Sequence, residues 1–159
     1  MMRTLTRGAL AGAAGTTALN AASYADMALR GRPTSSTPEQ TTALLAEKAG
    51  VDIPGDGADR ESRLTGLAAL NGIGVGVCVG VGVGLTSAVL RHVGLRLPRW
   101  AGAVATGALA MAAADIPIAR LGVSDPHTWS ATDWLSDAVP HLVYGLVTYG
   151  ALTTGRDRA

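Results

Sequence analysis

Four ionisable residues stand inside long apolar stretches of the sequence, and they are the first candidates for chemistry. They are Asp26, Asp115, Asp137 and His141. An ionisable side chain inside a bilayer costs several kcal/mol unless it is paired or hydrated, so each position is a functional candidate. Carboxylates beside a histidine can bind and release protons near neutral pH. The four residues therefore form a candidate polar cluster for handling protons or other ions.

Local pairing is the alternative interpretation, and the sequence favours it. Asp26 stands four residues before Arg30, and Asp115 stands five residues before Arg120, so each carboxylate has a cation nearby. Asp137 lies near the start of a predicted helix, where the helix dipole stabilises negative charge. Under this interpretation the four residues stabilise the fold and need carry no reaction.

A divalent metal site is a further alternative on the same segment. Asp133, Asp137 and His141 recur at intervals of four residues, which places them on one face of a helix. His127 is a weaker fourth candidate. Carboxylate and imidazole ligands suit zinc, manganese or iron. Pro140 interrupts the helical spacing, however, so the metal assignment stays unknown and no cofactor is expected.

The elements that carry these residues are predicted to be membrane helices. The chain has 159 residues, of which 48% are hydrophobic and only 16% charged, yet it contains 21 Gly and no Phe. Large apolar side chains normally fill a water-soluble core, whereas small residues let helices approach closely in lipid. We expect a single all-α membrane domain over 1–159, with about four transmembrane helices. The candidate spans, each near the length needed to cross a bilayer, are 8–29, 64–90, 100–119 and 134–154.

The first candidate span is the least apolar of the four. Segment 8–29 is rich in Ala, Gly and Thr, and Arg3 and Arg7 before it also suit a cleaved signal peptide. A retained span is the favoured interpretation. The loop that follows, 31–63, is predicted to contain a short amphipathic helix, because Thr37-Pro38-Glu39-Gln40 has the pattern of a capping box with Pro at the first helical position.

The second candidate span contains the glycine-rich sequence NGIGVGVCVGVGVGL at 71–85. On a helix its glycines form a ridge of small residues, a glycine zipper, made of Gly72, Gly76, Gly80 and Gly84. Gly74, Cys78 and Gly82 form a second such ridge. We therefore predict that this helix packs against two neighbours at the centre of the bundle. A phosphate-binding loop is excluded, since no Lys-Ser or Lys-Thr follows the glycines.

Basic residues predict how the chain is oriented in the membrane. One set of span ends carries Arg3, Arg7, Arg91, Arg96, Arg99, Arg156 and Arg158. By the positive-inside rule, both termini are expected in the cytoplasm of a bacterial cell with this protein in its plasma membrane. Arg30 and Arg32, which follow the first span, argue for the opposite orientation. The net charge of +1 gives no extended basic surface, so nucleic acid is not an expected partner.

Two stretches carry a resemblance to known proteins. The first runs from Leu19-Asn20 through Asp26, Arg30-Gly31-Arg32-Pro33 and Ser36-Thr37-Pro38-Glu39, and the second is Pro140-His141-Leu142-Val143-Tyr144-Gly145. They resemble small multi-pass membrane proteins of actinobacteria that have no assigned activity. The resemblance implies a multi-pass membrane protein and carries over no catalytic residue.

The sequence as a whole predicts a membrane protein with a structural or interaction role and no enzymatic activity. Its expected partners are the lipid bilayer and either a second copy of the chain or another membrane protein. In an up-down bundle the four residues of the polar cluster fall on one side of the membrane, and the predicted orientation makes this the outer side. A small proton- or ion-coupled transporter or channel-like protein that uses this outer-side polar cluster is the first alternative. A membrane protein that binds a divalent metal is the second.

Overall fold

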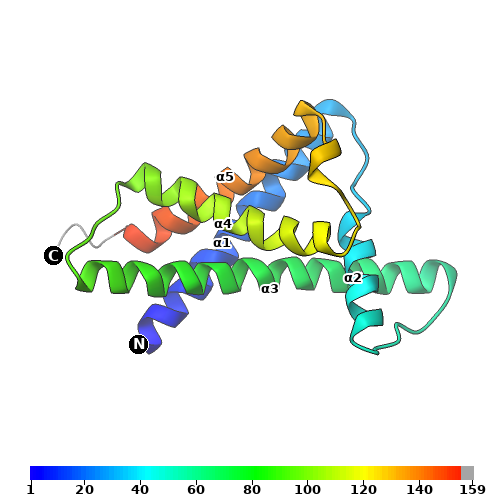
Figure 1. Ribbon diagram of the computed structural model, residues 1–159, viewed down its shortest axis with the longest axis horizontal. Helices are drawn as coiled ribbons and strands as arrows, with labels where there is room; N and C mark the ends of the chain where they lie inside the picture. Colours follow the sequence, from blue (N-terminus) through cyan, green and yellow to red (C-terminus); the bar gives the residue numbers. More distant parts are fainter. Residues whose placement is uncertain (155–159) are drawn as a thin grey trace.

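The computed structural model describes residues 1–154, and its regular structure over that range is entirely helical. Arg156 and Arg158, which the orientation prediction uses, lie outside the described residues. The five α-helices are α1 (Met2–Arg30), α2 (Thr37–Lys48), α3 (Gly57–His92), α4 (Arg99–Arg120) and α5 (Ala131–Thr153), with a 3-10 turn at Pro126–Thr128 (Figure 1). The prediction of an all-α chain is confirmed, and so is the short helix in the first loop. Helix α3 begins at Gly57, well before the predicted start of its span at position 64.

Two helices, α3 and α4, are long and apolar enough to cross a membrane. Helices α1 and α5 form where spans were predicted, but within residues 1–154 they do not reach the same level of length and apolarity combined. The hydropathy of α1 is lowered by its many Ala, Gly and Thr residues. That of α5 is lowered by polar residues in its first two turns, which are Thr132, Asp133, Ser136 and Asp137. By length and composition, the structure thus gives two candidate spans where the sequence predicted four.

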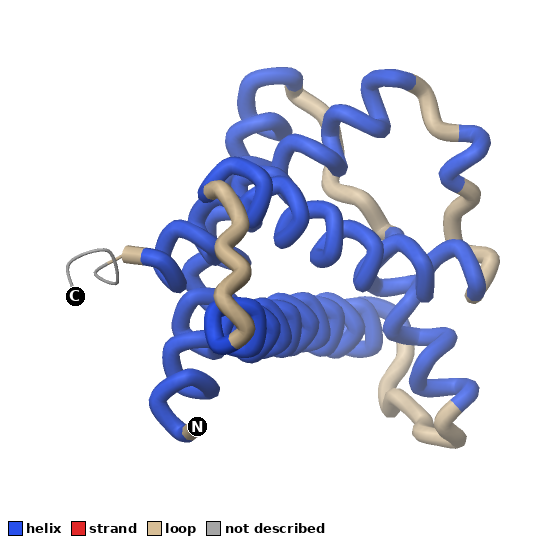
Figure 2. Tube along the Cα trace, turned by 60° about the vertical axis from the view of Figure 1, so that its left-hand side comes forward, coloured by secondary structure: helices blue, strands red, loops and turns tan. Residues whose placement is uncertain are grey.

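The helices are arranged so that α1 lies between α3 and α5, while α5 lies between α1 and α4. Figures 1 and 2 show α3 as a long rod that α1 crosses, with α4 and α5 on one side of it. Gly8 of α1 lies against Gly80 and Gly12 lies against Gly76, so α1 and α3 run antiparallel. Successive long helices therefore alternate in direction, which brings the end of α1, the end of α4 and the start of α5 to one end of the molecule. Helix α2 packs against α3.

Glycine allows α1 and α3 to approach to backbone contact. A Cβ atom placed on Gly80 would lie 2.5 Å from the Gly12 Cα, and one placed on Gly8 would lie 2.7 Å from the Val81 Cα. Gly84 is also buried at this crossing. Gly72, the first member of the predicted ridge, is exposed and has no neighbour within 4 Å of an added Cβ.

The second predicted ridge on α3 has no helix packed on it. An added Cβ at Gly74 or Gly82 would meet nothing within 4 Å, and Cys78 between them is exposed. The prediction that α3 packs closely through two small faces at the centre of the bundle is therefore wrong. The position between two partners belongs to α1, which uses its own glycines against α3 and its other face against α5.

The core is filled mainly by the second half of α5. Tyr144, Thr148 and Leu152 recur every four residues and are at most 1% exposed. The Tyr144 hydroxyl donates a hydrogen bond of 2.6 Å to the carbonyl oxygen of Gly76. This bond links α5 directly to α3, although α1 packs between these two helices. The Thr148 hydroxyl donates to the carbonyl oxygen of Ala11. Buried polar groups must be hydrogen-bonded, and here they connect helices.

Candidate functional site

The four residues of the predicted polar cluster all lie at the end of the molecule where α1 and α4 finish and α5 starts. The structure does not bring the four together. Asp26 belongs to a group between α1 and α5, and the other three form a second group between α4 and α5. Helix α5 contributes to both groups, through different faces.

The first group is built around the carboxylate of Asp26. Its Oδ2 atom accepts hydrogen bonds from Arg30 Nη2 at 2.7 Å and from Arg32 Nε at 2.5 Å. The helix ends between these arginines because Gly31 adopts a left-handed conformation (φ 65°), which turns the chain and returns Arg32 to Asp26. Arg30 also donates a hydrogen bond to Ser136 Oγ on α5. The group therefore joins the end of α1 to the start of α5.

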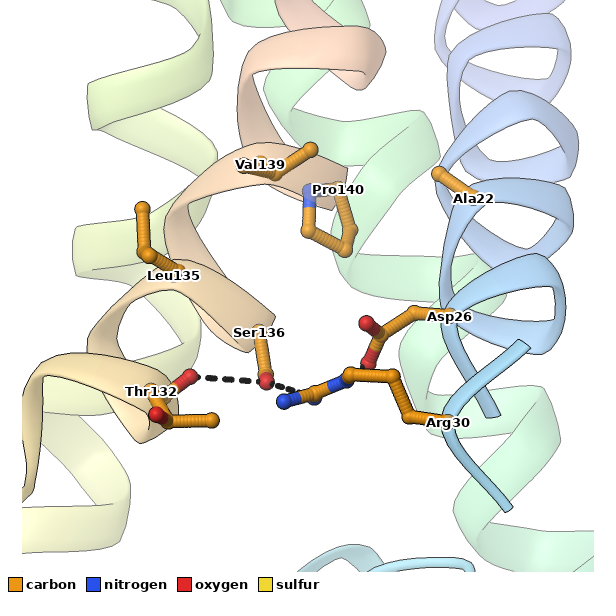
Figure 3. A pocket seen from close by; sticks show the side chains of 8 residues that line it. All are labelled: Ala22, Asp26, Arg30, Thr132, Leu135, Ser136, Val139 and Pro140. Carbon is orange, nitrogen blue, oxygen red and sulfur yellow. Dashed lines mark hydrogen bonds and ion pairs between the residues drawn. The ribbon is translucent and has the colours of Figure 1, made fainter. Parts of the chain in front are cut away.

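An open pocket of about 320 Å³ adjoins this group (Figure 3). Figure 3 shows Asp26 and Arg30 on one wall and Ser136 on the other, with the Arg30 guanidinium spanning the gap. The remaining lining residues are Ala22, Thr132, Leu135, Val139 and Pro140. Two arginines already share the one carboxylate of this pocket, so its charges are balanced to within one positive charge.

The second group consists of Asp115, Asp137 and His141. His141 Nδ1 lies 2.9 Å from the carbonyl oxygen of Asp137 and 3.3 Å from its carboxylate Oδ1. Asp115 reaches across from α4 and interacts with Asp137 and His141. The predicted pairing of Asp115 with Arg120 is not formed, whereas the predicted pairing of Asp26 with Arg30 is.

One oxygen atom of the Asp137 carboxylate, Oδ2, is buried without a hydrogen-bond partner. Ionised carboxylates only accept hydrogen bonds, so Asp115 in its charged form cannot supply one. A proton on either carboxyl group would provide the missing donor. The pair Asp115 and Asp137, with His141 beside it, is thus a group whose hydrogen bonding is completed by one proton.

The weak metal candidates do not assemble. Asp133 faces the start of α5, where its Oδ2 accepts hydrogen bonds from Ser130 N at 2.9 Å and Ser130 Oγ at 2.7 Å, and Ser130 Oγ accepts from the Asp133 backbone N–H. This capping box lowers the pKa of Asp133 and holds it away from the second group. His127 lies in the preceding turn, where its backbone N–H donates to Asp125. Within residues 1–154 no three His, Cys, Asp or Glu side chains are placed to share a metal ion.

Sequence reasoning did not identify Arg32 or Ser136 as members of the first group. Arg32 stands beyond the helix end and six residues from Asp26, so helical spacing does not predict the contact. The Arg30 to Ser136 bond spans 106 residues and depends on which helices are neighbours. The Gly31 helix stop was the one local signal available for Arg32.

Comparison with known proteins found no matching family model, no matching curated protein and no matching solved structure.

Proposed function

We propose that this chain is an integral membrane protein that crosses the bilayer four times, through 8–29, 64–90, 100–119 and 134–154, and has a non-enzymatic structural or interaction role. The observation that carries the role is how its polar side chains are used. They bridge neighbouring helices at one end, α1 to α5 through Arg30 and Ser136, and α4 to α5 through Asp115 and Asp137. Hydrogen bonds of this kind hold helices together in lipid.

The packing supports four crossings although, within residues 1–154, only α3 and α4 are apolar enough on their own. Helix α1 crosses α3 where Gly8 and Gly12 contact Gly80 and Gly76. Helix α5 packs on α4 from Tyr149, which covers Gly102, to His141, whose carbonyl oxygen faces Gly107. All of these contacts lie within the predicted spans, so the packed parts of α1 and α5 would share the bilayer with α3 and α4. The outward faces of α1 and α5 also expose large apolar side chains, including Leu10 (66%), Val139 (49%) and Leu146 (53%). Lipid would cover these side chains.

Topology reporters test the four crossings. In-frame fusions after Arg96 and after Asp125 should report opposite sides of the membrane, with the first in the cytoplasm by the positive-inside rule. A fusion after Gly50 should report the same side as the fusion after Asp125. If the Gly50 and Asp125 fusions lie on opposite sides, the four-span arrangement is refuted. If both are reversed together, only the orientation is wrong.

A flux assay in proteoliposomes tests the structural role. We expect vesicles containing the protein to pass protons no faster than empty vesicles, and Asp115→Asn to leave that rate unchanged. We expect Ser136→Ala, which removes the acceptor for Arg30, to lower thermal stability in detergent by about 0.5–1 kcal/mol. Proton flux that depends on pH and is lost in both Asp26→Asn and Asp115→Asn would overturn the structural role.

Proton handling is the second candidate function, and one specific observation favours it. The buried Oδ2 atom of Asp137 lacks a donor that a proton on Asp115 would supply. The first group differs in its charge balance, because two arginines neutralise the Asp26 carboxylate. Flux lost in Asp115→Asn but retained in Asp26→Asn would therefore assign proton transfer to the second group alone. A homo-oligomer or a membrane protein partner stays a prediction.

A further inference from the structure

The end of the molecule opposite the polar cluster carries a separate concentration of charge, and it is all positive within residues 1–154. Arg3 and Arg7 stand at the start of α1, and Arg91, Arg96 and Arg99 surround the connection from α3 to α4. The sequence has no Asp or Glu before Asp26 and none between Glu61 and Asp115. Among the described residues, the segments that carry Arg91 and Arg96 thus hold no acidic side chain beside these two arginines.

A pocket of about 140 Å³ opens among these arginines, where the end of α3, the α3–α4 connection and the end of α5 meet. Three kinds of residue line it. The basic residues are Arg91, Arg96 and Arg99, the hydroxyl residues are Ser87, Tyr149 and Thr153, and the apolar residues are Leu90, Leu95 and Leu97.

The lining residues differ in depth. Ser87 and Tyr149 are 8% and 7% exposed, so they belong to the buried floor of the pocket. Leu95 and Leu97 are 59% and 49% exposed, so they form an apolar rim. The pocket therefore offers guanidinium groups and hydroxyls inside and apolar surface at its edge.

This combination matches the chemistry of a phospholipid. Guanidinium groups form charge-assisted, often bidentate hydrogen bonds with phosphate oxygens. Trp100, which follows the lining residue Arg99 in the chain, is 72% exposed, and exposed Trp is typical of the headgroup level of a membrane. Basic pockets between helices on the cytoplasmic side are known to hold anionic headgroups. We propose that this pocket, defined by Arg91, Arg96, Ser87 and Tyr149, binds the phosphate of an anionic phospholipid, with Leu95 and Leu97 against its acyl chains.

The pocket at the other end shows why the proposal concerns this one. There Arg30 and Arg32 both hydrogen-bond to Asp26, so the protein supplies the anion itself. Among residues 1–154, no Asp or Glu lines the pocket around Arg91 and Arg96. This inference rests on the proposed membrane location, because the apolar rim has a role only where acyl chains are present.

Lipid titration of the full chain, followed by native mass spectrometry from detergent, tests the proposal. The probes are phosphatidylglycerol, which is anionic, phosphatidylcholine, which is zwitterionic, and inorganic phosphate. The test variant is Arg91→Gln with Arg96→Gln. The matched control is Arg60→Gln with Arg120→Gln, which removes the same charge from exposed positions at the other end. Each arginine near an anionic surface contributes roughly fivefold, so we expect phosphatidylglycerol binding to weaken about 30-fold in the test variant and less than about twofold in the control.

Each outcome decides a different point. Equal weakening in the two double variants would mean a general effect of net charge and would overturn the pocket. Tight binding of inorganic phosphate that competes with the lipid would assign the site to free phosphate and refute the lipid. Extraction of the protein from membranes by alkaline carbonate would overturn both the proposed function and this inference, whereas retention with no lipid preference overturns this inference alone. If the double variant does not fold, Arg96→Gln alone is measured, with an expected weakening of about fivefold.

Discussion

Replacing Gly80 by Ala places one methyl group at the closest approach of two helices. The added Cβ would lie 2.5 Å from the Gly12 Cα, 2.5 Å from the Gly8 carbonyl oxygen and 2.6 Å from the Gly12 nitrogen. All three atoms belong to the backbone of α1, so no side-chain rotation relieves the contact. Because ordinary contacts of a Cβ begin at 3.4 Å, α1 and α3 must separate by about 1 Å.

The energetic consequence follows from packing. A gap of about 1 Å forfeits roughly a quarter to a half of the dispersion energy of each contact along the crossing. Overpacking a close interface typically costs about 1–3 kcal/mol. Alanine also favours the helix over glycine by about 1 kcal/mol, which offsets part of this cost. The comparison therefore needs a second glycine on the same helix that gains the same propensity.

Gly82→Ala is that control. It lies two residues away on α3, and an added Cβ there meets nothing within 4 Å. We expect Gly82→Ala to be neutral or stabilising by up to about 1 kcal/mol, and Gly80→Ala to be less stable than Gly82→Ala by about 1–3 kcal/mol. Melting in detergent, followed by loss of the monodisperse peak in size-exclusion chromatography, should separate the two by about 3–9 °C. Equal melting temperatures would refute the α1–α3 crossing.

Three further predictions follow from single contacts. Gly145→Ala should destabilise the protein by about 1–3 kcal/mol, since its Cβ would lie 2.6 Å from a backbone nitrogen of α4, whereas Gly150→Ala meets nothing and should be neutral; detergent melts compare them. Tyr144→Phe removes the 2.6 Å hydrogen bond to a carbonyl of α3 and should cost about 1 kcal/mol in the same assay, with no change showing that the bond contributes nothing. An NMR titration of Asp133 should give a pKa below the ordinary value of 3.8, and in Ser130→Ala this pKa should rise towards 3.8. Because this pKa is lowered on folding, its stabilising effect is complete above pH 3.8 and is lost as the pH falls through the lowered pKa; an unchanged pKa in the variant would contradict the capping box.

The sequence predicted the helices well, because their signals are local. Long apolar runs and the charged loops between them placed α3 and α4, and the Thr37-Pro38 start placed α2. It was harder to predict which helices pack together. A glycine ridge shows that another helix can approach closely, but it does not specify which helix does so. The ridge on α3 was recognised, but its partner ridge of Gly8 and Gly12 on α1 is hidden in a segment rich in small residues throughout.

The candidate site divides in the same way. Antiparallel alternation, which follows from counting spans, correctly predicts that Asp26, Asp115, Asp137 and His141 share one end of the molecule. Their division into two groups depends on the faces of α5, and these faces are set by neighbours that no local pattern specifies. Asp137 and His141 stand one turn apart and meet as helical spacing predicts. Asp115 joins them only because α4 packs on α5.

The distribution of charge links the two ends of the molecule. At the end with the polar cluster, the protein itself supplies the counterions of Asp26, which are Arg30 and Arg32. At the other end, Arg91 and Arg96 line a pocket that has no acidic lining residue within residues 1–154. Charges at a membrane surface that the protein leaves without an internal counterion are neutralised by the surface itself. The same arginines that orient the chain by the positive-inside rule would then also hold its lipid, so Arg91→Gln with Arg96→Gln should weaken lipid binding even where the remaining basic residues preserve the topology.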